Sequence, residues 1–534
     1  MGRIAVAAIV SMWVIPVSIL VNLLVPDPYM DEIFHIPQAQ QYCKGNFKSW
    51  DPMITTPPGL WDAIFFLIFK LSLNGTFCVL EVVMYYLSLA HVASLFPGMF
   101  FLQAVSSYFE VCSTAVLRST NGVLAVLCSL VIFEIIAHLR PALDDRKATL
   151  HAVVLALYPL HWFFNFLYYT DVASLTAVLA MYLACLKKKY QLSALLGVLA
   201  VIIRQTNIIW MLFVACTGVI DITLADRRND EKVDDSNVLI RKNYRLVATS
   251  SVTMGSNLRK RKSDSAVNKS DISVPRTSTS STTQKSGLLD EMEAIILTSW
   301  QMKWEILVSF TPFILALVGF VVFVYWNGSV VLGAKEAHAI SPHFAQILYF
   351  SLVSALFTSP VHFSLGQAAT LFRSFWKNRL LGFFLVLLAL IACFLSVHFF
   401  SLAHPYLLAD NRHYPFYLWR KVIKAHWLMK YLLVPLYVYS WFSIFSILGK
   451  TRRKIWVLAY FLATAAVLVP APLIEFRYFT IPFYFMIIHS NIDENRNWLL
   501  MGVLYLALNV FTMMLFLLRP FHWDHESGIQ RFIW

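Results

Sequence analysis

The chain has 534 residues, of which 58% are hydrophobic and only 14% charged, and its formal net charge is +13. Soluble domains carry about 25% charged residues, so this composition excludes a soluble enzyme with one anchor and indicates a polytopic membrane protein. The basic residues stand in short clusters beside apolar runs, which is typical of cytosolic loops. No stacking platform accompanies these clusters, which argues against a nucleic-acid partner.

Residues 4–25 form the first apolar run, which is long enough for a helix that crosses a bilayer with about 20 residues. A cleaved signal peptide would have a shorter apolar core and a small-residue cleavage site. Neither is evident, so a retained helix is predicted. Residues 26–59 then form a polar segment with four carboxylates and one histidine, which is unusually varied for a simple connector.

Further apolar runs follow almost to residue 518, and roughly a dozen membrane-spanning helices are predicted. Helices rather than barrel strands are expected because backbone polar groups in lipid must be satisfied within the chain, and strand alternation is absent. The clearer runs cover residues 122–139, 151–168, 172–186, 304–326, 344–359, 380–403, 427–448, 455–470 and 498–518. The predicted fold class is therefore an all-α polytopic membrane protein.

Residues 225–287 interrupt this pattern with many Ser and Thr residues and mixed charge. Low hydrophobicity of this kind predicts a disordered loop, here in the cytosol. The loop divides the chain into an N-terminal transmembrane module, residues 1–224, and a C-terminal transmembrane module, residues 288–534.

The alternation of spans from this cytosolic loop predicts which polar loops share the opposite face. Residues 327–343, 404–424 and 471–477 fall on that far side. The very short N-terminus and the first helix place residues 26–59 there as well. A chain with merely solvated connectors would not need its unusual loops on one face.

The first polar segment contains a candidate general base. Asp31 and Glu32 are adjacent, so on a short helix their side chains point about 100° apart and do not act on one substrate atom. This favours a single carboxylate base over the paired carboxylates of a glycosidase. His35 falls at i+4 from Asp31, on the same face. The alternative is that the stretch is only an interfacial helix cap.

The second polar loop, "HPYLLADNRHYPFYLWRK", covers residues 404–421. Arginine and histidine are expected around a phosphate, since a guanidinium can bind two oxygens at once. Aromatic rings interleaved with hydrogen-bonding groups also suit sugar rings. The alternative, an aromatic belt with basic anchors at the headgroups, accounts for Tyr and Trp but not for the "ADNRHY" core.

Two smaller polar groups lie in the remaining far-side loops. Lys335, His338 and His343 stand near the end of a span, and Glu475 and Arg477 stand at a membrane edge. We interpret the second group as a structural ion pair rather than a catalytic one.

No nucleotide-binding loop, zincin helix or nucleophile elbow is present. The seven cysteines include no C-x-x-C and no metal spacing, so neither an ATP-driven nor a metal-dependent reaction is expected. Asn74 and Asn327 begin sequons that are compatible with a membrane of the secretory pathway.

Seven sequence blocks together resemble one family. They are "PYMDEIFHIPQAQQYC", "WDPMITTPPGL", "NFLYYTD", "RQTNIIW", "YLLADNRHYPFYLWRK", "EFRYF" and "QRFIW". In this order they resemble the dolichyl-phosphate-glucose-dependent α-1,2-glucosyltransferases of the endoplasmic reticulum, a branch of the GT-C glycosyltransferases. Residues 225–287 and the region around 62–110 do not obviously match.

The resemblance implies a fold and a reaction. The fold would be that of GT-C enzymes, with the active site on the lumenal face of the endoplasmic reticulum membrane. Glucose would pass from dolichyl phosphate β-D-glucose to the diglucosylated dolichyl-diphosphate oligosaccharide. The product would carry the terminal α-1,2-linked glucose of the N-glycosylation precursor. A β-linked donor and an α-linked product imply inversion, with no metal or other cofactor.

The resemblance also implies residue roles. Related GT-C enzymes use an acidic residue of the first lumenal loop as the base, which corresponds to Asp31, with Glu32 as second choice. The candidates for binding the donor phosphate are Arg412, His413, Arg420, Lys335 and His338. The candidates for binding the acceptor or a sugar are His35, Asp51, Asp410, Asn411 and Tyr414. The expected partners are the two lipid-linked substrates and membrane lipid, and no protein partner is indicated.

The competing hypothesis is a polytopic lipid or solute transporter, or a channel accessory subunit. Such a protein would carry charges near the centres of several spans and inverted internal repeats. The sequence shows no repeat, and its richest polar residues lie in loops. Arg204, inside an apolar run, is the main feature that favours the transporter, unless it snorkels to the headgroups.

Overall fold

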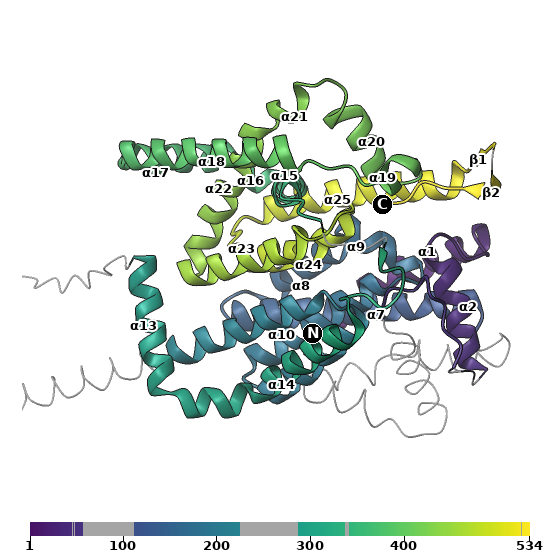
Figure 1. Cartoon of the computed structure of the whole chain (residues 1–534), viewed down its shortest axis with the longest axis horizontal. Coiled ribbons are helices and arrows are strands. Elements are labelled where there is room, and N and C mark those ends of the chain that lie inside the picture. The colour runs from purple at the N-terminus through teal and green to yellow at the C-terminus, as the bar shows by residue number, and fades with distance from the viewer. Residues whose placement is uncertain (45, 47, 57–111, 225–286, 337–340, 525) are drawn as a thin grey trace, which may run out of the picture. The chain divides into compact units, whose positions relative to one another are not determined.

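The computed structural model describes residues 1–44, 46, 48–56, 112–224, 287–336, 341–524 and 526–534 (Figure 1). These residues divide into two compact units. The first unit combines residues 1–218 with 307–534, and the second covers residues 219–306. The predicted disordered loop, residues 225–287, lies outside the described residues except for Gly287, so it stays a prediction together with the division into modules.

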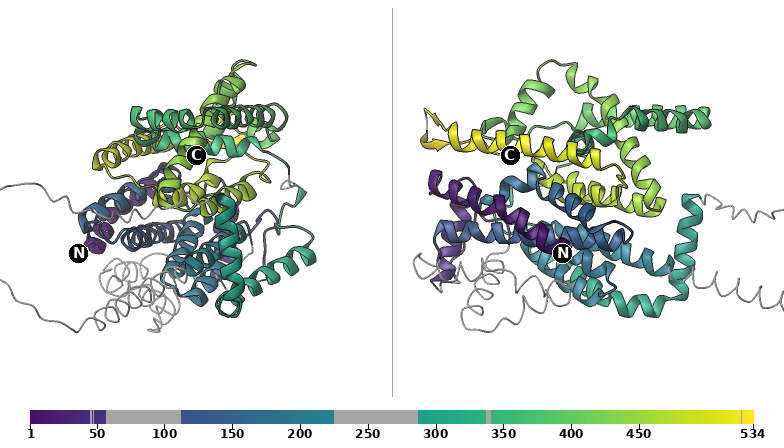
Figure 2. Two further views of the ribbon diagram at one scale, coloured as in Figure 1. Left: turned by 90° about the vertical axis from the view of Figure 1, so that its left-hand side faces the viewer. Right: turned by 180° about the vertical axis from the view of Figure 1, so that it is seen from behind.

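Helices form nearly all of the regular structure, which confirms the predicted all-α class. The N-terminal helices are α1 (Gly2–Leu24), α2 (Glu32–Cys43), α7 (Thr114–Leu139), α8 (Asp145–Ala156), α9 (Pro159–Trp162), the 3-10 turn η1 (Phe163–Phe166), α10 (Thr170–Leu186), α11 (Tyr190–Ile203) and a helix Asn207–Leu224. The second unit contributes α13 (Leu288–Gln301). Within the first unit α7 packs against α1, α8 and α10 (Figure 2).

The C-terminal part begins with a long helix and ends with a small hairpin. Its elements are α14 (Lys303–Asn327), α15 (Ala345–Phe357), α16 (Ser359–His362), α17 (Leu365–Lys377), α18 (Arg379–Phe400), α19 (Pro405–Ala409), α20 (Tyr414–Leu418), the π-helical turn η3 (Trp419–Ile423), α21 (Met429–Leu432), α22 (Val434–Thr451), α23 (Lys454–Leu468), the 3-10 turn η4 (Phe476–Phe479), α24 (Thr480–His489), α25 (Asn495–Leu518), β1 (Phe521–Trp523) and β2 (Glu526–Gln530). The antiparallel hairpin β1–β2 pairs Phe521 with Gln530, and the sequence analysis did not predict it.

Seven helices among the described residues are long and apolar enough to cross a membrane: α1, α7, Asn207–Leu224, α14, α18, Met429–Thr451 and α25. Four more apolar helices, α10, α11, α15 and α23, are shorter. A multi-pass membrane protein is therefore confirmed. The count of roughly a dozen spans stays a prediction because residues 57–111 lie outside the described part.

The predicted single span 151–168 is wrong, because the chain breaks there. Helix α8 ends at Ala156 and α9 begins at Pro159, which is the first residue of that helix. Proline has no N–H to donate to the preceding turn, so it suits a helix start and not a helix interior. The break lets the chain run extended through Leu167 and Tyr169, which are next to the first polar loop.

Aromatic rings form the core between α8–α10 and α24. Tyr158 stacks on Phe483 with ring centroids 3.9 Å apart, and it also meets the ring edge of Tyr484. The hydroxyl of Tyr484 donates to the carbonyl of Leu155 at 2.7 Å. Aromatic pairs add about 0.5–1.5 kcal/mol beyond the area that they bury. The N-terminal and C-terminal parts of the first unit therefore share one core.

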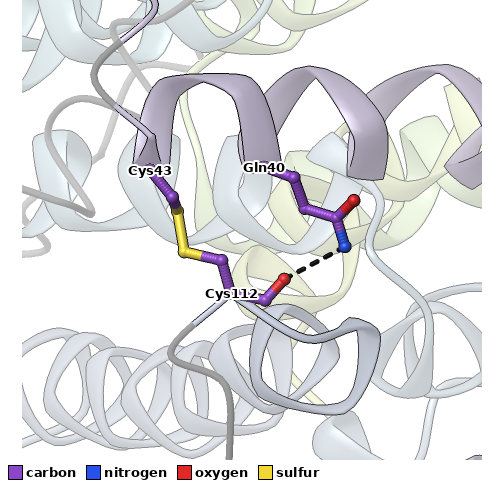
Figure 3. The surroundings of a disulfide bond; sticks show 3 residues. All are labelled: Gln40, Cys43 and Cys112. Atoms are coloured by element: carbon purple, nitrogen blue, oxygen red, sulfur yellow. Dashed lines mark hydrogen bonds between the residues drawn. A yellow bond between two sulfur atoms is a disulfide. The ribbon is translucent and has the colours of Figure 1, made fainter.

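A disulfide joins Cys43, at the end of α2, to Cys112, just before α7 (Figure 3). The side-chain amide of Gln40 donates to the carbonyl of Cys112 at 3.1 Å beside it. The two cysteines are 69 positions apart in sequence, so no local spacing pattern revealed the pair. The disulfide fixes the first polar loop against the start of α7.

We predict that Cys43→Ser destabilises the protein by about 2–4 kcal/mol, because loss of a disulfide releases conformational freedom in the unfolded chain. Thermal unfolding of the purified protein measures the effect, and Cys216→Ser, which removes a free exposed cysteine, serves as the control. Without reductant, alkylation followed by mass spectrometry is expected to leave Cys43 and Cys112 unlabelled. Labelling of Cys43 before reduction would contradict the pairing.

Candidate active site

The polar loops that are predicted to share the far side meet at one end of the first unit. The backbone N–H of Leu332 donates to the carbonyl of Thr55 at 3.1 Å, and that of His343 donates to Val469 at 2.9 Å. Gly333 is required at this crossing, because a Cβ there would lie 2.2 Å from the carbonyl oxygen of Pro52. Residues 332–334 therefore lie against residues 52–55, and residues 341–343 lie against residues 469–470, directly before the 471–477 loop.

Glu32, the first residue of α2, is buried and has no access to a substrate. Both of its oxygens bind Arg118 of α7, with Nε to Oε1 at 2.8 Å and Nη2 to Oε2 at 2.6 Å. The backbone N–H groups of Tyr29 and Tyr168 donate to the same carboxylate at 3.0 and 2.6 Å. A carboxylate with four such donors is fully satisfied, so Glu32 has a structural role.

Arg118 is buried to the same degree, with 1% of its side chain exposed. Besides Glu32 it donates to the backbone carbonyls of Val25 and Asp27, at 2.6 and 3.0 Å. These carbonyls lie at the end of α1 and the start of the first loop. The pair therefore holds this loop onto α7.

Asp31, one residue earlier, has the opposite environment. It is the N-cap of α2, and 41% of its side chain is exposed, against 0% for Glu32. Successive side chains of a helix point about 100° apart, so the side chains of Asp31 and Glu32 point in different directions. Oδ2 of Asp31 accepts from Nη1 of Arg477 at 2.8 Å. Oδ1 of Asp31 makes no hydrogen bond within the described residues.

The charges around Asp31 keep it ionised. Burial raises its pKa, but the charge and hydrogen bond of Arg477 outweigh this effect, with further contributions from His35 and His413. The pKa of Asp31 therefore lies below its ordinary value. Burial in turn lowers the pKa of His35, although the charge of Asp31 opposes the change. The phenol oxygen of Tyr169 accepts from the backbone N–H of Asp31 at 3.2 Å.

Arg477 belongs to a chain of alternating charges. Its Nε pairs with Glu475, and its Nη1 lies 3.8 Å from Oδ2 of Asp171. Asp171 in turn binds Nη1 of Arg204 at 2.6 Å. Three carboxylates, including Asp31, face two guanidinium groups, which leaves one net negative charge. The predicted ion pair between Glu475 and Arg477 is present, and Arg477 also contacts Asp31 directly.

Arg204 does not lie within a span, contrary to the sequence analysis. It is the C-cap of α11, at the break before the helix Asn207–Leu224. Its partner Asp171 stands at the start of α10. The arginine is therefore part of the polar end of the first unit.

The second loop is organised by an internal ion pair. Arg412 donates two hydrogen bonds to Asp410, from Nε to Oδ1 at 2.9 Å and from Nη2 to Oδ2 at 2.7 Å. Its Nη1 donates to the side-chain oxygen of Gln530 at 2.8 Å. Asn411 accepts from the indole N–H of Trp523 at 2.9 Å. Burial raises the pKa of Asp410, but the hydrogen bond of Arg412 and the charge of His413 hold it below its ordinary value.

Residues 530–534 connect the second loop to the first. The N–H of Ile533 donates to the carbonyl of Arg412 at 3.0 Å, and the N–H of Tyr414 donates to the carbonyl of Ile533 at 3.1 Å. Tyr29 of the first loop exchanges two hydrogen bonds with the backbone of Arg531, at 2.6 and 2.7 Å. The two loops are thus fixed relative to each other through this segment.

The structure brings some of the predicted site residues together and separates others. Asp31, His35 and His413 are close enough for their charges to interact. Asp51 acts on His35 from the same loop, and its Oδ1 accepts from the backbone N–H of Met53 at 2.9 Å.

Two of the remaining cations stand in other positions. Lys335 donates to the carbonyl of Asn327 at 2.6 Å in a different loop, and Arg420 is exposed in η3. His338 lies outside the described residues. The hydroxyl of Tyr414 is buried without a hydrogen-bond partner in the part of the chain that the structure describes.

Arg118, Tyr169 and Asp171 were not predicted as members of the site. Tyr169 and Asp171 belong to the block "NFLYYTD", whose match to the family was the available signal. The available signal for Arg118 was a charge at the start of an apolar run, but its partner Glu32 stands 86 positions away and could not be inferred from spacing. Among the described residues no group of three or more His, Cys, Asp or Glu side chains could hold a metal ion, and metal independence stays a prediction.

We predict that the two neighbouring carboxylates differ in their effect on stability. Glu32→Gln leaves the charge of buried Arg118 without its partner, which costs about 3–5 kcal/mol. Asp31→Asn breaks a half-exposed pair, which costs about 1 kcal/mol or less. Thermal unfolding in one detergent compares them, and Glu32→Gln combined with Arg118→Gln is expected to recover part of the loss. Equal destabilisation by both single changes would contradict the assigned environments.

Comparisons with known proteins agree with the resemblance found in the sequence blocks. A model of the DIE2/ALG10 family matches residues 25–488. A protein of Arabidopsis thaliana named Dol-P-Glc:Glc(2)Man(9)GlcNAc(2)-PP-Dol alpha-1,2-glucosyltransferase is 59% identical over the full length of both chains. Proteins of the same name from Mus musculus and Homo sapiens are each 32% identical over 95% of this chain and 93% of their own. No solved structure matches. The chain therefore belongs to the DIE2/ALG10 family.

Proposed function

We propose that this protein is the glucosyltransferase that completes the lipid-linked oligosaccharide for N-glycosylation. It moves glucose from dolichyl phosphate β-D-glucose to the acceptor named for its relatives, Glc(2)Man(9)GlcNAc(2)-PP-Dol, and forms an α-1,2 linkage. The observation that carries the proposal is the contrast between Asp31 and Glu32. One carboxylate is half-exposed with a free oxygen at the meeting point of the polar loops, and the other is buried and fully bound.

Asp31 acts as the general base in a single displacement. Its Oδ2 is held by Arg477, so Oδ1 is left to take the proton of the acceptor hydroxyl. As the hydroxyl oxygen bonds to the anomeric carbon, the bond from that carbon to the phosphate oxygen breaks. Dolichyl phosphate leaves with the electron pair, and the configuration inverts. General bases contribute about 10²–10⁴-fold to such rates.

The leaving phosphate is expected on the side of the second loop. The cluster of Asp31, Asp171, Glu475, Arg204 and Arg477 carries a net negative charge and disfavours an anion. Positive or hydrogen-bonding groups stabilise a leaving phosphate best where they are preorganised.

His413, whose charge acts on Asp31, and Arg420, beyond it in the same loop, are the best placed candidates for this role, although the ring of His413 also contacts Asp410 and the carbonyl of Trp534. Arg412 is a weaker candidate because Asp410 already compensates its charge, and Lys335 is weaker because it binds a carbonyl in another loop. His338 remains a candidate from the sequence alone.

The candidates for binding sugars fall into two groups. His35 and Asp51 belong to the loop of Asp31 and suit the acceptor. Asp410 and Asn411 are engaged with Arg412 and with an indole, so they build the second loop more than they offer free groups. Tyr414 has an unpartnered hydroxyl among the described residues that suits a sugar oxygen.

Two observations support a lumenal site in the endoplasmic reticulum. Disulfides form in oxidising compartments such as the lumen, and Cys43–Cys112 anchors the loop that carries Asp31. Helix α10 begins beside the site at Thr170 and ends just before the basic run Lys187–Lys189. Basic runs favour the cytosolic side, so the two ends of one helix indicate the same orientation.

The transporter hypothesis receives no support. Its main argument was a charge inside a span, and Arg204 instead caps a helix at the polar end of the first unit, bound to Asp171.

We predict that Asp31→Asn lowers glucose transfer by about 10²–10⁴-fold, because the amide does not accept the hydroxyl proton. Purified protein, synthetic dolichyl phosphate glucose and diglucosylated acceptor, with EDTA present, provide the assay. Asp51→Asn, in the same loop, is the control and is expected to keep the chemical step. Full activity of Asp31→Asn would remove Asp31 as the base, and no transfer by folded wild type would refute the substrates.

We predict that Arg477→Gln moves the acid limb of the pH–activity profile upward. The base must be ionised, so activity falls as the pH drops through its pKa, and Arg477 holds that pKa below its ordinary value. Removal of Arg477 raises the pKa of Asp31, so the variant loses activity at a higher pH than wild type does. Near pH 8 the variant loses less activity than it does at low pH. Arg412→Gln, which frees Asp410 instead, is expected to leave the limb in place. An unmoved limb in Arg477→Gln would contradict the pairing.

A further inference from the structure

The segment that follows the second loop carries positive charge without compensation. Between Asp410 and Glu475 the sequence contains no Asp or Glu. Within this acid-free stretch, four cations stand in the eleven residues 420–430, "RKVIKAHWLMK". They are Arg420, Lys421, Lys424 and Lys430, and the first three are exposed. We refer to these four cations as the basic patch.

The basic patch differs from the arginines around Asp31. Each of those arginines has a carboxylate partner: Arg118 has Glu32, Arg204 has Asp171, Arg412 has Asp410 and Arg477 has Asp31. No carboxylate in the described part of the chain forms an ion pair with any cation of the basic patch.

Three of the four cations of the basic patch lie over aromatic rings, and Arg420 is 5.8 Å from the ring centre of Phe416. Lys424 is 5.8 Å from the ring centre of Trp419, and Lys430 is 4.8 Å from that of Tyr431. Such contacts position a cation but leave its full charge available. A group of unpaired cations attracts an anion from outside the protein.

Apolar side chains beside the basic patch place it at the membrane surface. Trp427 is 71% exposed and Leu432 is 57% exposed. The hydroxyl of Tyr431 lies 2.8 Å from a ring nitrogen of His398, near the end of the membrane-spanning helix α18. Exposed Trp and Leu side chains at a span end enter the lipid, while neighbouring Lys and Arg side chains reach the headgroup layer.

The basic patch also continues from the proposed site. Helix α20 begins directly after His413 and passes into the π-turn η3, which contains Arg420 and Lys421. Seven helical residues correspond to a rise of about 10 Å, so Arg420 lies near the site and Lys430 lies further along the chain. π-turns occur frequently at functional positions.

We propose that the three lysines of the basic patch, Lys421, Lys424 and Lys430, bind the diphosphate group of the lipid-linked acceptor. This inference rests on the proposed function. The donor phosphate is bonded to the reacting carbon, so it must lie beside Asp31. The diphosphate of the acceptor named Glc(2)Man(9)GlcNAc(2)-PP-Dol is separated from its glucose end by mannose and N-acetylglucosamine units, so it must lie elsewhere, at the membrane surface. The diphosphate carries a charge on each of its two phosphates, whereas a phosphodiester carries a single charge. Several unpaired cations therefore match the diphosphate better than they match a phosphodiester.

The kinetic test replaces three of the lysines, which the proposed mechanism does not use, with glutamine: Lys421→Gln, Lys424→Gln and Lys430→Gln. We expect KM for the acceptor to rise about 10- to 100-fold, since each cation near a lipid surface contributes moderately to anion binding. We expect kcat and the donor KM to change less than about twofold, because charge loss outside the reacting centre weakens binding alone. Added salt is expected to raise the acceptor KM less in the variant than in wild type.

A matched control uses cations at the end of α17 and at the start of α18. Arg373, Lys377 and Arg379 are also exposed, and Arg379 lies 4.1 Å from the ring centre of Trp376. Their triple replacement by glutamine removes the same charge and is expected to leave the acceptor KM unchanged. A rise in the donor KM alone in the lysine variant would assign the patch to the donor phosphate and overturn the proposal.

Direct binding separates this inference from the proposed function. Radiolabelled farnesyl diphosphate is titrated against full-length Asp31→Asn protein in nanodiscs of neutral lipid, where no transfer is needed. We expect the protein to bind farnesyl diphosphate and farnesyl phosphate to compete only weakly. The triple lysine variant is expected to lose this binding. Equal binding by the lysine variant would overturn the proposal. The proposal would also be overturned if anionic phospholipid in the nanodisc abolished the binding while the acceptor KM stayed unchanged. Retained binding together with no glucose transfer by folded wild type would refute the proposed function alone.

Discussion

The buried ion pair between Glu32 and Arg118 is the interaction on which the rest of the site depends. Burial of two charges costs several kcal/mol for each, and the pair is tolerated only when further hydrogen bonds satisfy both groups. Here the backbone N–H groups of Tyr29 and Tyr168 complete the carboxylate, and carbonyls at the end of α1 complete the guanidinium. Because Glu32 is fixed inward at the first turn of α2, the helical rotation turns Asp31 outward. The direction of the candidate base thus follows from its neighbour's burial.

Charge is divided in space at this end of the molecule. Around Asp31 every arginine is matched by carboxylates, and the net negative charge suits a group that accepts a proton. Toward residues 420–430, no carboxylate of the described residues forms an ion pair with the cations. An inverting displacement needs a base on one side of the anomeric carbon and an anion acceptor on the other. A uniform positive field would suit the phosphate but would weaken the base, so the separation serves both requirements.

The sequence predicted features that depend on residues close together in the chain. It did not predict contacts between residues that are far apart in the chain. Hydropathy found most spans within a few residues because lipid excludes unpaired backbone groups, yet it overlooked the break that Pro159 imposes. The spacing of Asp31 and Glu32 implied that only one of them acts. Arg477, the partner of Asp31, stands 446 positions away from it, and Arg118, the partner of Glu32, stands 86 positions away. No periodicity links such positions.

Residues 530–534 determine how precisely the two loops are held. Arg531 donates to the carbonyls of Phe516 and Leu517 at the end of α25 and to Leu24 at the end of α1, so it satisfies carbonyls that helix ends leave open. Its backbone binds Tyr29, two residues before Asp31. The neighbouring Ile533 pairs with the backbone on both sides of His413. Reacting groups must be held to within fractions of an ångström for an in-line displacement. Residues 530–534 contribute to that requirement, because their backbone hydrogen bonds hold both loops in fixed positions.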